Sequence, residues 1–165
     1  MRLDLREIIN IPGGQVPFDY EPDLSALSFD SVKEIQKPVH VSGRVQNIAG
    51  VLVLSADISA ELVCVCARCL KEFEHSMHVC VRATLAEEIQ DESDADVFLL
   101  EGDSIDVDEI VTTYFVLNME PRFLCREDCK GLCSKCGADL NEGPCTCKAE
   151  IDPRLTVLGQ LLENE

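Results

Sequence analysis

Basic residues are scarce in this sequence. Lysine and arginine together number 14, against 31 aspartates and glutamates, which gives a formal net charge of −17 at pH 7. Proteins that bind nucleic acid normally neutralise phosphates with lysine and arginine, so a chain this acidic is a poor direct ligand for bare RNA or DNA. The negative field instead favours a basic protein as the partner.

Long apolar runs are also missing. The longest candidate, Ile48 to Leu54, has the length of a strand, whereas a helix needs about 20 apolar residues to cross a bilayer. The chain opens with MRLDLREII, which lacks the apolar stretch and cleavage site of a secretory signal. We therefore expect a cytoplasmic protein without membrane contact, in a compartment that keeps thiols reduced.

Tryptophan is absent, and recognisable catalytic motifs are absent too. The sequence has no Gly-rich phosphate loop, no nucleophile elbow and no H-E-x-x-H. His40, His75 and His78 lie on predicted strands without a partner at helical spacing, which is typical of ordinary surface or core histidines. We therefore expect a protein that is not an enzyme.

Cysteine, by contrast, is abundant and clustered, with six of the ten cysteines between Cys125 and Cys147. In Cys133-Ser-Lys-Cys136-Gly137, a C-x-x-C turn followed by glycine brings two thiolates to one side of a tight loop. Cys145 and Cys147 follow just beyond the turn-forming 141–144 stretch and complete a tetrahedral set. This spacing predicts a first metal site.

A second site follows from the thiols that remain. Cys125 and Cys129 have no partners within the cluster, and the distant Cys66-Ala-Arg-Cys69 is a C-x-x-C without a second pair. Joining the two pairs completes a second shell, although an exchange such as Cys129 for Cys133 stays open. All-cysteine shells are typically closed and structural, so we expect one or two structural Zn²⁺ ions.

Other roles for the cysteines are weighed against metal binding. Disulfides need an oxidising compartment, and a redox C-x-x-C at Cys66 and Cys69 needs a βαβ context that the sequence does not show. Cys64 shares the inward face of its predicted strand and Cys80 lies on the polar face of the next. Because the two side chains point to opposite faces of the predicted sheet, a disulfide between them is disfavoured unless a bulge changes the strand register.

The fold class predicted is α+β. Alternating apolar residues predict an antiparallel meander from Pro38 to Leu85, with strands near 39–46, 51–65 and 73–85 and a turn at 47–50. A short strand is expected within 1–9 and another at 97–100. The stretch from Pro17 to Ser31 is expected to be a connecting loop with room for one short element.

Two helices are also expected. Asp106-Val-Asp-Glu109 resembles a capping box, which predicts the start of a helix that ends by Pro121. An apolar stripe along this helix should pack on the sheet. The stripe comprises Val107, Ile110, Val111, Tyr114 and Leu117. Asp152-Pro153 starts a short amphipathic helix, which either packs on the domain or binds a partner. We expect a sheet-plus-helix domain over 1–120, and a zinc knot with a terminal helix over 121–165.

Acidic charge is concentrated in one segment. Between Ala83 and Pro121 there are twelve carboxylates and no lysine, arginine or histidine. Such runs are commonly solvated surface, and a docking surface for a basic partner is the alternative.

Several motifs together resemble the YceD family. They are Cys66-Ala-Arg-Cys69-Leu70, Leu100-Glu-Gly-Asp103 running into Ile105-Asp-Val107, Cys129-Lys-Gly-Leu-Cys133 leading to Cys136-Gly137, Asp139-Leu-Asn141, and Asp152-Pro-Arg154. The resemblance implies ribosome biogenesis: a role in accumulation of 23S rRNA, through its synthesis, processing or stability, without known catalytic activity. It also implies a genomic association with a small, basic protein of the large ribosomal subunit.

The resemblance and the charge suggest one hypothesis. A zinc-stapled acidic module would hold a basic protein of the large ribosomal subunit or of its assembly. The alternative is a zinc-ribbon module that contacts rRNA directly through the few basic residues near the cluster, namely Lys130, Lys135, Lys148 and Arg154.

Overall fold

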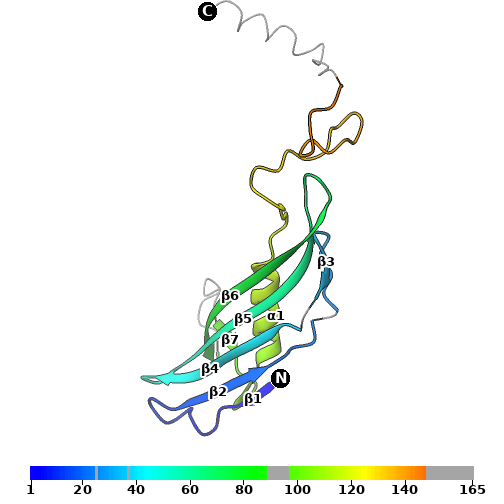
Figure 1. The fold of residues 1–165 in the computed structure, drawn as a ribbon. Coiled ribbons are helices and arrows are strands. Elements are labelled where there is room, and N and C mark those ends of the chain that lie inside the picture. The colour runs from blue at the N-terminus through cyan, green and yellow to red at the C-terminus, as the bar shows by residue number, and fades with distance from the viewer. Residues whose placement is uncertain (25, 37, 89–96, 148–165) are drawn as a thin grey trace, which may run out of the picture.

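The structure is a computed structural model that describes residues 1–24, 26–36, 38–88 and 97–147. Within these ranges the chain forms a six-stranded sheet, a two-stranded sheet and one α-helix (Figure 1). The elements are β1 (Arg2–Asp4), β2 (Gln15–Tyr20), β3 (Val32–Ile35), β4 (His40–Ile48), β5 (Val51–Val65), β6 (Glu72–Ala86), β7 (Val97–Leu99), β8 (Ser104–Asp106) and α1 (Val107–Leu117).

The predicted antiparallel meander is confirmed as β4, β5 and β6. Ala49 and Gly50 join β4 to β5 with φ of 54° and 94°, the left-handed conformation that a tight hairpin turn requires. Alternate residues of β5 from Leu52 to Cys64 are buried, as are those of β6 from Met77 to Leu85. Period-two alternation therefore sets both the register and the inward face.

The other strands extend this meander. The order of the larger sheet is β2-β4-β5-β6-β7, and β3 pairs with β5 beyond the end of β4. The stretch 17–31, expected to be a loop with room for a short element, contains the end of β2, which runs through Pro17. Proline is tolerated there because β2 lies at a sheet edge, where one side of the strand makes no ladder bonds. β7 pairs in parallel with β6, and β1 pairs with β8 in the small sheet.

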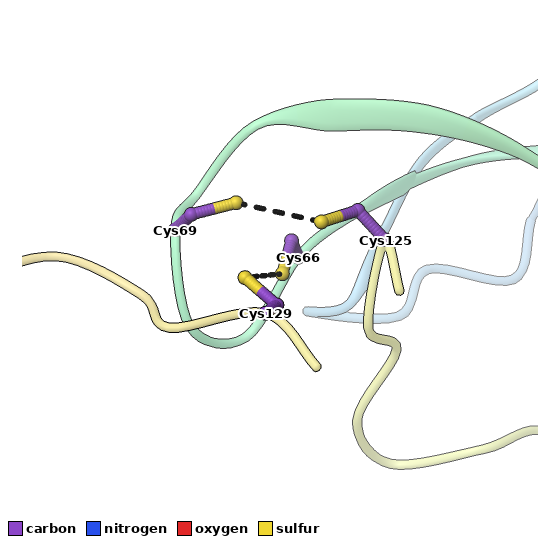
Figure 2. Close-up of side chains that lie close together, drawn as sticks. All are labelled: Cys66, Cys69, Cys125 and Cys129. Atoms are coloured by element: carbon purple, nitrogen blue, oxygen red, sulfur yellow. Dashed lines mark hydrogen bonds between the residues drawn. The ribbon is translucent and has the colours of Figure 1, made fainter. Parts of the chain in front are cut away.

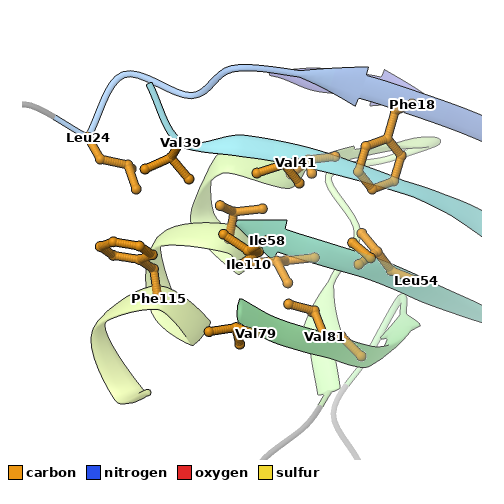
Figure 3. Packing of buried hydrophobic residues seen from close by; sticks show 14 of the residues in the cluster. Phe18, Leu24, Val39, Val41, Leu54, Ile58, Val79, Val81, Ile110 and Phe115 are labelled. Carbon is orange, nitrogen blue, oxygen red and sulfur yellow. The ribbon is translucent and has the colours of Figure 1, made fainter. Parts of the chain in front are cut away.

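Helix α1 covers one face of the sheet (Figure 3). The Asp106 side chain accepts a hydrogen bond from the backbone N–H of Asp108 at 3.0 Å and caps the first turn. Val107, Ile110, Val111 and Phe115 are buried. The predicted stripe was wrong at its last member, because Phe115 fills the core while Leu117, in the final turn, is 75% exposed.

Three expectations remain, on membrane-spanning helices, the helix after Asp152 and the division into two domains. No helix among the described residues has the length and apolar character needed to span a membrane. The helix expected after Asp152 lies outside the described residues, and the division at 120/121 stays a prediction.

Asn47 holds the loop before β2 against the sheet. Its side chain is 1% exposed, and its Nδ2 donates to the backbone oxygens of Ile8 and Ile9 at 2.8 and 2.7 Å. Its Oδ1 accepts from the backbone N–H of Gly50 at 2.8 Å, at the β4–β5 turn. One amide side chain thus satisfies three backbone groups from two segments.

We expect Asn47→Ala to lower the free energy of unfolding by roughly 3 kcal/mol, because it leaves those buried backbone groups without partners. Urea denaturation of the full chain, followed by circular dichroism, measures this. Gln46→Ala, on the neighbouring open-face position, is the control and should change stability by less than about 0.5 kcal/mol. Equal effects of the two substitutions would contradict the role given to Asn47.

Candidate metal centres

The tip of the β5–β6 hairpin presents two cysteines. Cys66 follows the last residue of β5, and its backbone N–H bonds to the Lys71 oxygen at 2.9 Å. The Leu70 N–H returns to the Cys66 oxygen at 2.9 Å, with Leu70 at a φ of 58°. This closed turn places the Cys66 and Cys69 thiols together at the end of the sheet.

The segment after α1 brings two more cysteines to this tip. Phe123 forms a bridge with Cys66, and its oxygen accepts from the Ala67 N–H at 2.8 Å. The Phe123 ring is 2% exposed and lies 4.9 Å from the His75 ring, centroid to centroid. Anchored in this way, the chain delivers Cys125 and Cys129 to the hairpin.

We call Cys66, Cys69, Cys125 and Cys129 the hairpin quartet (Figure 2). Its four Sγ atoms lie within 4.8 Å of one another, with 3.8 Å between Cys66 and Cys129 and 3.7 Å between Cys69 and Cys125. Tetrahedral zinc with Zn–S bonds of about 2.3 Å places its sulfurs about 3.8 Å apart. The donors and their spacing fit a closed, all-sulfur Zn²⁺ site.

The electrostatics of the hairpin quartet favour a cation. Burial raises the pKa of the Cys66 thiol, but hydrogen bonds from the backbone N–H groups of Cys125, Cys69 and Arg68 outweigh it and lower the pKa to about 6. Burial and the neighbouring thiols raise the pKa of Cys125 to about 12. Four thiolates this close repel one another, and a divalent cation offsets that repulsion.

The second cluster, Cys133, Cys136, Cys145 and Cys147, is named the loop quartet. Gly137 has a φ of 73°, and its N–H bonds to the Cys133 oxygen at 2.8 Å, which closes the C-x-x-C turn. The Cys133 and Cys145 sulfurs lie 3.4 Å apart. Backbone N–H groups of Cys136 and Lys135 lower the pKa of Cys133 to about 6, and the loop quartet is more exposed than the hairpin quartet.

The eight predicted thiols thus gather in the two sets predicted, and Cys129 does not exchange with Cys133. Metal binding by these sets remains a prediction. Cys64 is buried opposite Phe73, and Cys80 is exposed opposite Asp57, so these two lie apart on different faces. Among the described residues, no histidine joins a cluster of this kind.

Three residues that support the clusters had no role in the sequence prediction. Arg68, between two hairpin ligands, donates from Nη1 to the backbone oxygens of Glu127 and Cys129 at 3.2 and 2.8 Å. Gly131 has a φ of 74°, and a Cβ there would lie 2.9 Å from the Arg68 oxygen. Asn141 hydrogen-bonds to the Cys129 sulfur at 3.5 Å. The sequence signals for Asn141 were its place at the start of the predicted turn over 141–144 and in a family motif, and neither indicated contact with Cys129.

Comparison with known proteins gives one family. A model described as "Large ribosomal RNA subunit accumulation protein YceD" matches residues 54–162. The chain is 26% identical to the uncharacterized protein YlbN of Bacillus subtilis, over 100% of this chain and 98% of that protein. It is also 26% identical to an uncharacterized protein of Mycobacterium leprae, over 86% of this chain and 67% of that protein.

A third relative is an uncharacterized protein of Mycobacterium bovis, 28% identical over 74% of this chain and 61% of that protein. The chain thus spans about two thirds of the length of the mycobacterial relatives it matches. No solved structure matches it significantly.

We expect protein purified under reducing, chelator-free conditions to contain two zinc ions per chain, one for each quartet. Cys129→Ser and Cys136→Ser should each reduce the content to one, because each removes one ligand of a four-sulfur shell. Mass-spectrometric metal analysis per chain provides the measurement. Cys80→Ser is the matched control, since the Cys80 thiol bonds to Asp57 away from both quartets. Native protein free of metal would contradict both sites.

Removing the metal should loosen the cysteine-containing end and leave the sheet folded. The hairpin quartet forms a small buried cluster separate from the main core, so few apolar contacts hold the 121–147 segment in place. We expect a chelator to speed proteolysis within this segment by about tenfold or more, because metal binding stabilises such small modules strongly. Limited proteolysis with mass spectrometry locates the cuts, and added zinc should restore protection. Unchanged cleavage would contradict the role of metal.

Proposed function

The chain belongs to the YceD family, and from this we propose that it supports accumulation of large-subunit rRNA by holding a basic protein of that subunit or of its assembly. The family is linked to large-subunit rRNA accumulation and is not known to be catalytic. The proposed chemistry is recognition: carboxylates on the surface compete with rRNA phosphates for the cationic side chains of the partner.

An apolar cavity with an acidic rim carries this proposal. The cavity has a volume of about 670 Å³ and lies where β5 begins and β6 ends. Apolar side chains of Val51, Leu85 and Leu100 line it, together with Glu87 and Glu88. Lysine and arginine bury their alkyl stems on apolar surface while the charged head stays at a polar edge. The cavity therefore fits a basic side chain.

The charge of this stretch of the sequence supports the same interpretation. Exposed carboxylates at Asp103 and Glu109 belong to the same base-free acidic segment as the cavity rim. The cavity lies where β5 begins and β6 ends. The opposite end of this strand pair is the β5–β6 turn (Figure 1), which carries Cys66 and Cys69. Partner docking and the proposed metal sites thus occupy opposite ends of one sheet.

The proposed metal ions have a structural role. All-sulfur quartets leave no open coordination position for a substrate. At the hairpin, Cys66 and Cys69 hold one side of the shell, and Cys125 and Cys129 hold the other. This arrangement fixes the segment after α1 against the sheet.

Pull-down from a ribosome-containing lysate tests the docking surface. We expect the wild-type chain to recover a basic protein of the large subunit or its assembly at low salt and to lose it at high salt. Glu87→Gln with Glu88→Gln should reduce recovery roughly tenfold, since each exposed charge pair contributes up to about 1 kcal/mol. The matched control, Glu34→Gln with Glu127→Gln, changes the net charge equally at other exposed positions and should retain binding.

The same experiment separates direct rRNA contact, the second candidate. Arg68, Arg126 and Lys130 lie beside the quartets, which favours that candidate, whereas Lys148 and Arg154 lie outside the described residues. Recovery of rRNA that survives the Glu87/Glu88 change but is lost in Lys130→Gln with Lys135→Gln would contradict protein docking and support RNA contact. Ribonuclease-resistant recovery of a basic protein supports docking.

A further inference from the structure

Asn141 connects the two quartets. It belongs to the loop between Cys136 and Cys145, and therefore to the loop quartet, yet its Nδ2 donates to the Cys129 sulfur of the hairpin quartet at 3.5 Å. Its Oδ1 accepts from the Lys130 N–H at 2.8 Å and from Arg126 Nη2 at 2.7 Å. Lys130 follows Cys129 and Arg126 precedes it, so one amide contacts the ligand sulfur, the backbone N–H after the ligand and a side chain before it.

We propose that Asn141 is a positioning residue that links the two metal sites, so that closing the loop quartet strengthens metal binding by the hairpin quartet. This inference rests on the metal binding that the proposed function includes. Asn141 is not adjacent to Cys129 in the sequence, and the proposal gives it a role in positioning that ligand.

The position of Asn141 is set from within its own loop. Asp139 Oδ1 accepts from the Asn141 backbone N–H at 2.9 Å and from Nδ2 at 2.7 Å. Asp139 in turn pairs with Lys71 of the hairpin, through Oδ2 and Nζ at 2.8 Å. The carboxylate therefore orients the amide and ties its loop to the β5–β6 tip.

The two ends of that loop are ligands of the loop quartet. Cys136 precedes it and Cys145 follows it, so a metal held by both pairs restricts the loop that carries Asn141. With the loop ordered, the amide reaches Cys129 without a further loss of conformational freedom. A hydrogen bond to a coordinating thiolate stabilises its charged form and fixes its direction, as partners of metal ligands generally do.

The backbone between the quartets is close-packed, which makes the link specific. Gly131 lies against Arg68, and the Leu132 N–H bonds to the Arg68 oxygen at 3.1 Å. The Leu140 N–H bonds to the Gly131 oxygen at 2.9 Å. A displacement of the Asn141 loop is therefore transmitted through a few short contacts to the hairpin ligands.

A double-mutant cycle on the full chain tests the link, with the dissociation constant of the hairpin site as the readout. Zinc competition with a chromogenic chelator gives the constant, and the charge-transfer bands of Co²⁺ confirm four-thiolate coordination. Cys129→Ser, which leaves only the loop quartet complete, identifies the hairpin site by difference. The variants are Cys145→Ser with Cys147→Ser, which opens the loop quartet, Asn141→Ala, and all three changes together. Glu142→Gln is the control, since it removes only the exposed ion pair between Glu142 and Lys71 at 3.1 Å and leaves the Asn141 contacts and the Asp139–Lys71 pair in place.

We expect opening the loop quartet to weaken zinc binding at the hairpin site by about tenfold, and Asn141→Ala to do the same while both sites still fill. The combined variant should bind zinc at the hairpin site no more weakly than either variant alone, because both changes break the same connection between the quartets. Asn141→Asp keeps the acceptor oxygen but loses the N–H to sulfur, so it should bind as weakly as Asn141→Ala. Glu142→Gln should match the wild type.

Several outcomes overturn the inference. Hairpin affinity that is unchanged when the loop quartet is opened, or that falls multiplicatively in the combined variant, shows that Asn141 is not the link. Full affinity in Asn141→Asp rejects the N–H···S contact as its basis. A wild-type chain that binds neither Zn²⁺ nor Co²⁺ instead overturns the metal sites of the proposed function. A wild-type chain that binds two metals, with the same hairpin affinity as every variant, would reject the link alone.

Discussion

Four cysteine sulfur atoms lie together at the tip of the β5–β6 hairpin, and the conformation of the cysteine-containing end depends on this contact. Two belong to the β5–β6 turn, and two arrive from the segment after α1. The apolar cluster around them is small and separate from the main core. Hydrophobic burial holds the sheet and helix together, but at this tip a cation among thiolates would supply most of the stabilisation. Backbone bonds at Ala67 and Leu132 then fix the path of the chain between the quartets.

Charge and sulfur are separated along the length of the molecule. The acid-rimmed cavity lies beside Val51 and Ala86, where the long hairpin strands begin and end, and the quartets lie at the opposite tip. Carboxylates beside thiolates add to their mutual repulsion unless a cation pairs with them, and near the quartets Asp139 and Glu142 pair with Lys71. Near the quartets, the basic side chains of Arg68 and Lys71 contact backbone oxygens and carboxylates. One end is therefore suited to attract cationic side chains, and the other is suited to keep its shape.

The sequence predicted most where a period or a spacing was strong. The meander over β4 to β6 followed from alternation, and the two sets of four thiols followed from C-x-x-C spacing. β2 was not identified because its residues show no clear alternation, and Pro17 fits a strand only at a sheet edge. Phe115 replaced Leu117 in the core because periodicity does not show where the sheet ends beneath a helix. The roles of Arg68, Gly131 and Asn141 are tertiary contacts, for which a single sequence has no periodic signal.

The separation of the hairpin ligands along the chain has a consequence for biosynthesis. Cys66 and Cys129 are 63 positions apart, and Cys69 and Cys125 are 56 apart. At translation speeds of about 5–20 residues per second, the first pair leaves the ribosome several seconds before the second. During that interval the nascent hairpin carries two thiols whose partners have not yet been made. Under the proposed metal binding, zinc supply and oxidant level at the exit tunnel would then influence the yield of folded protein.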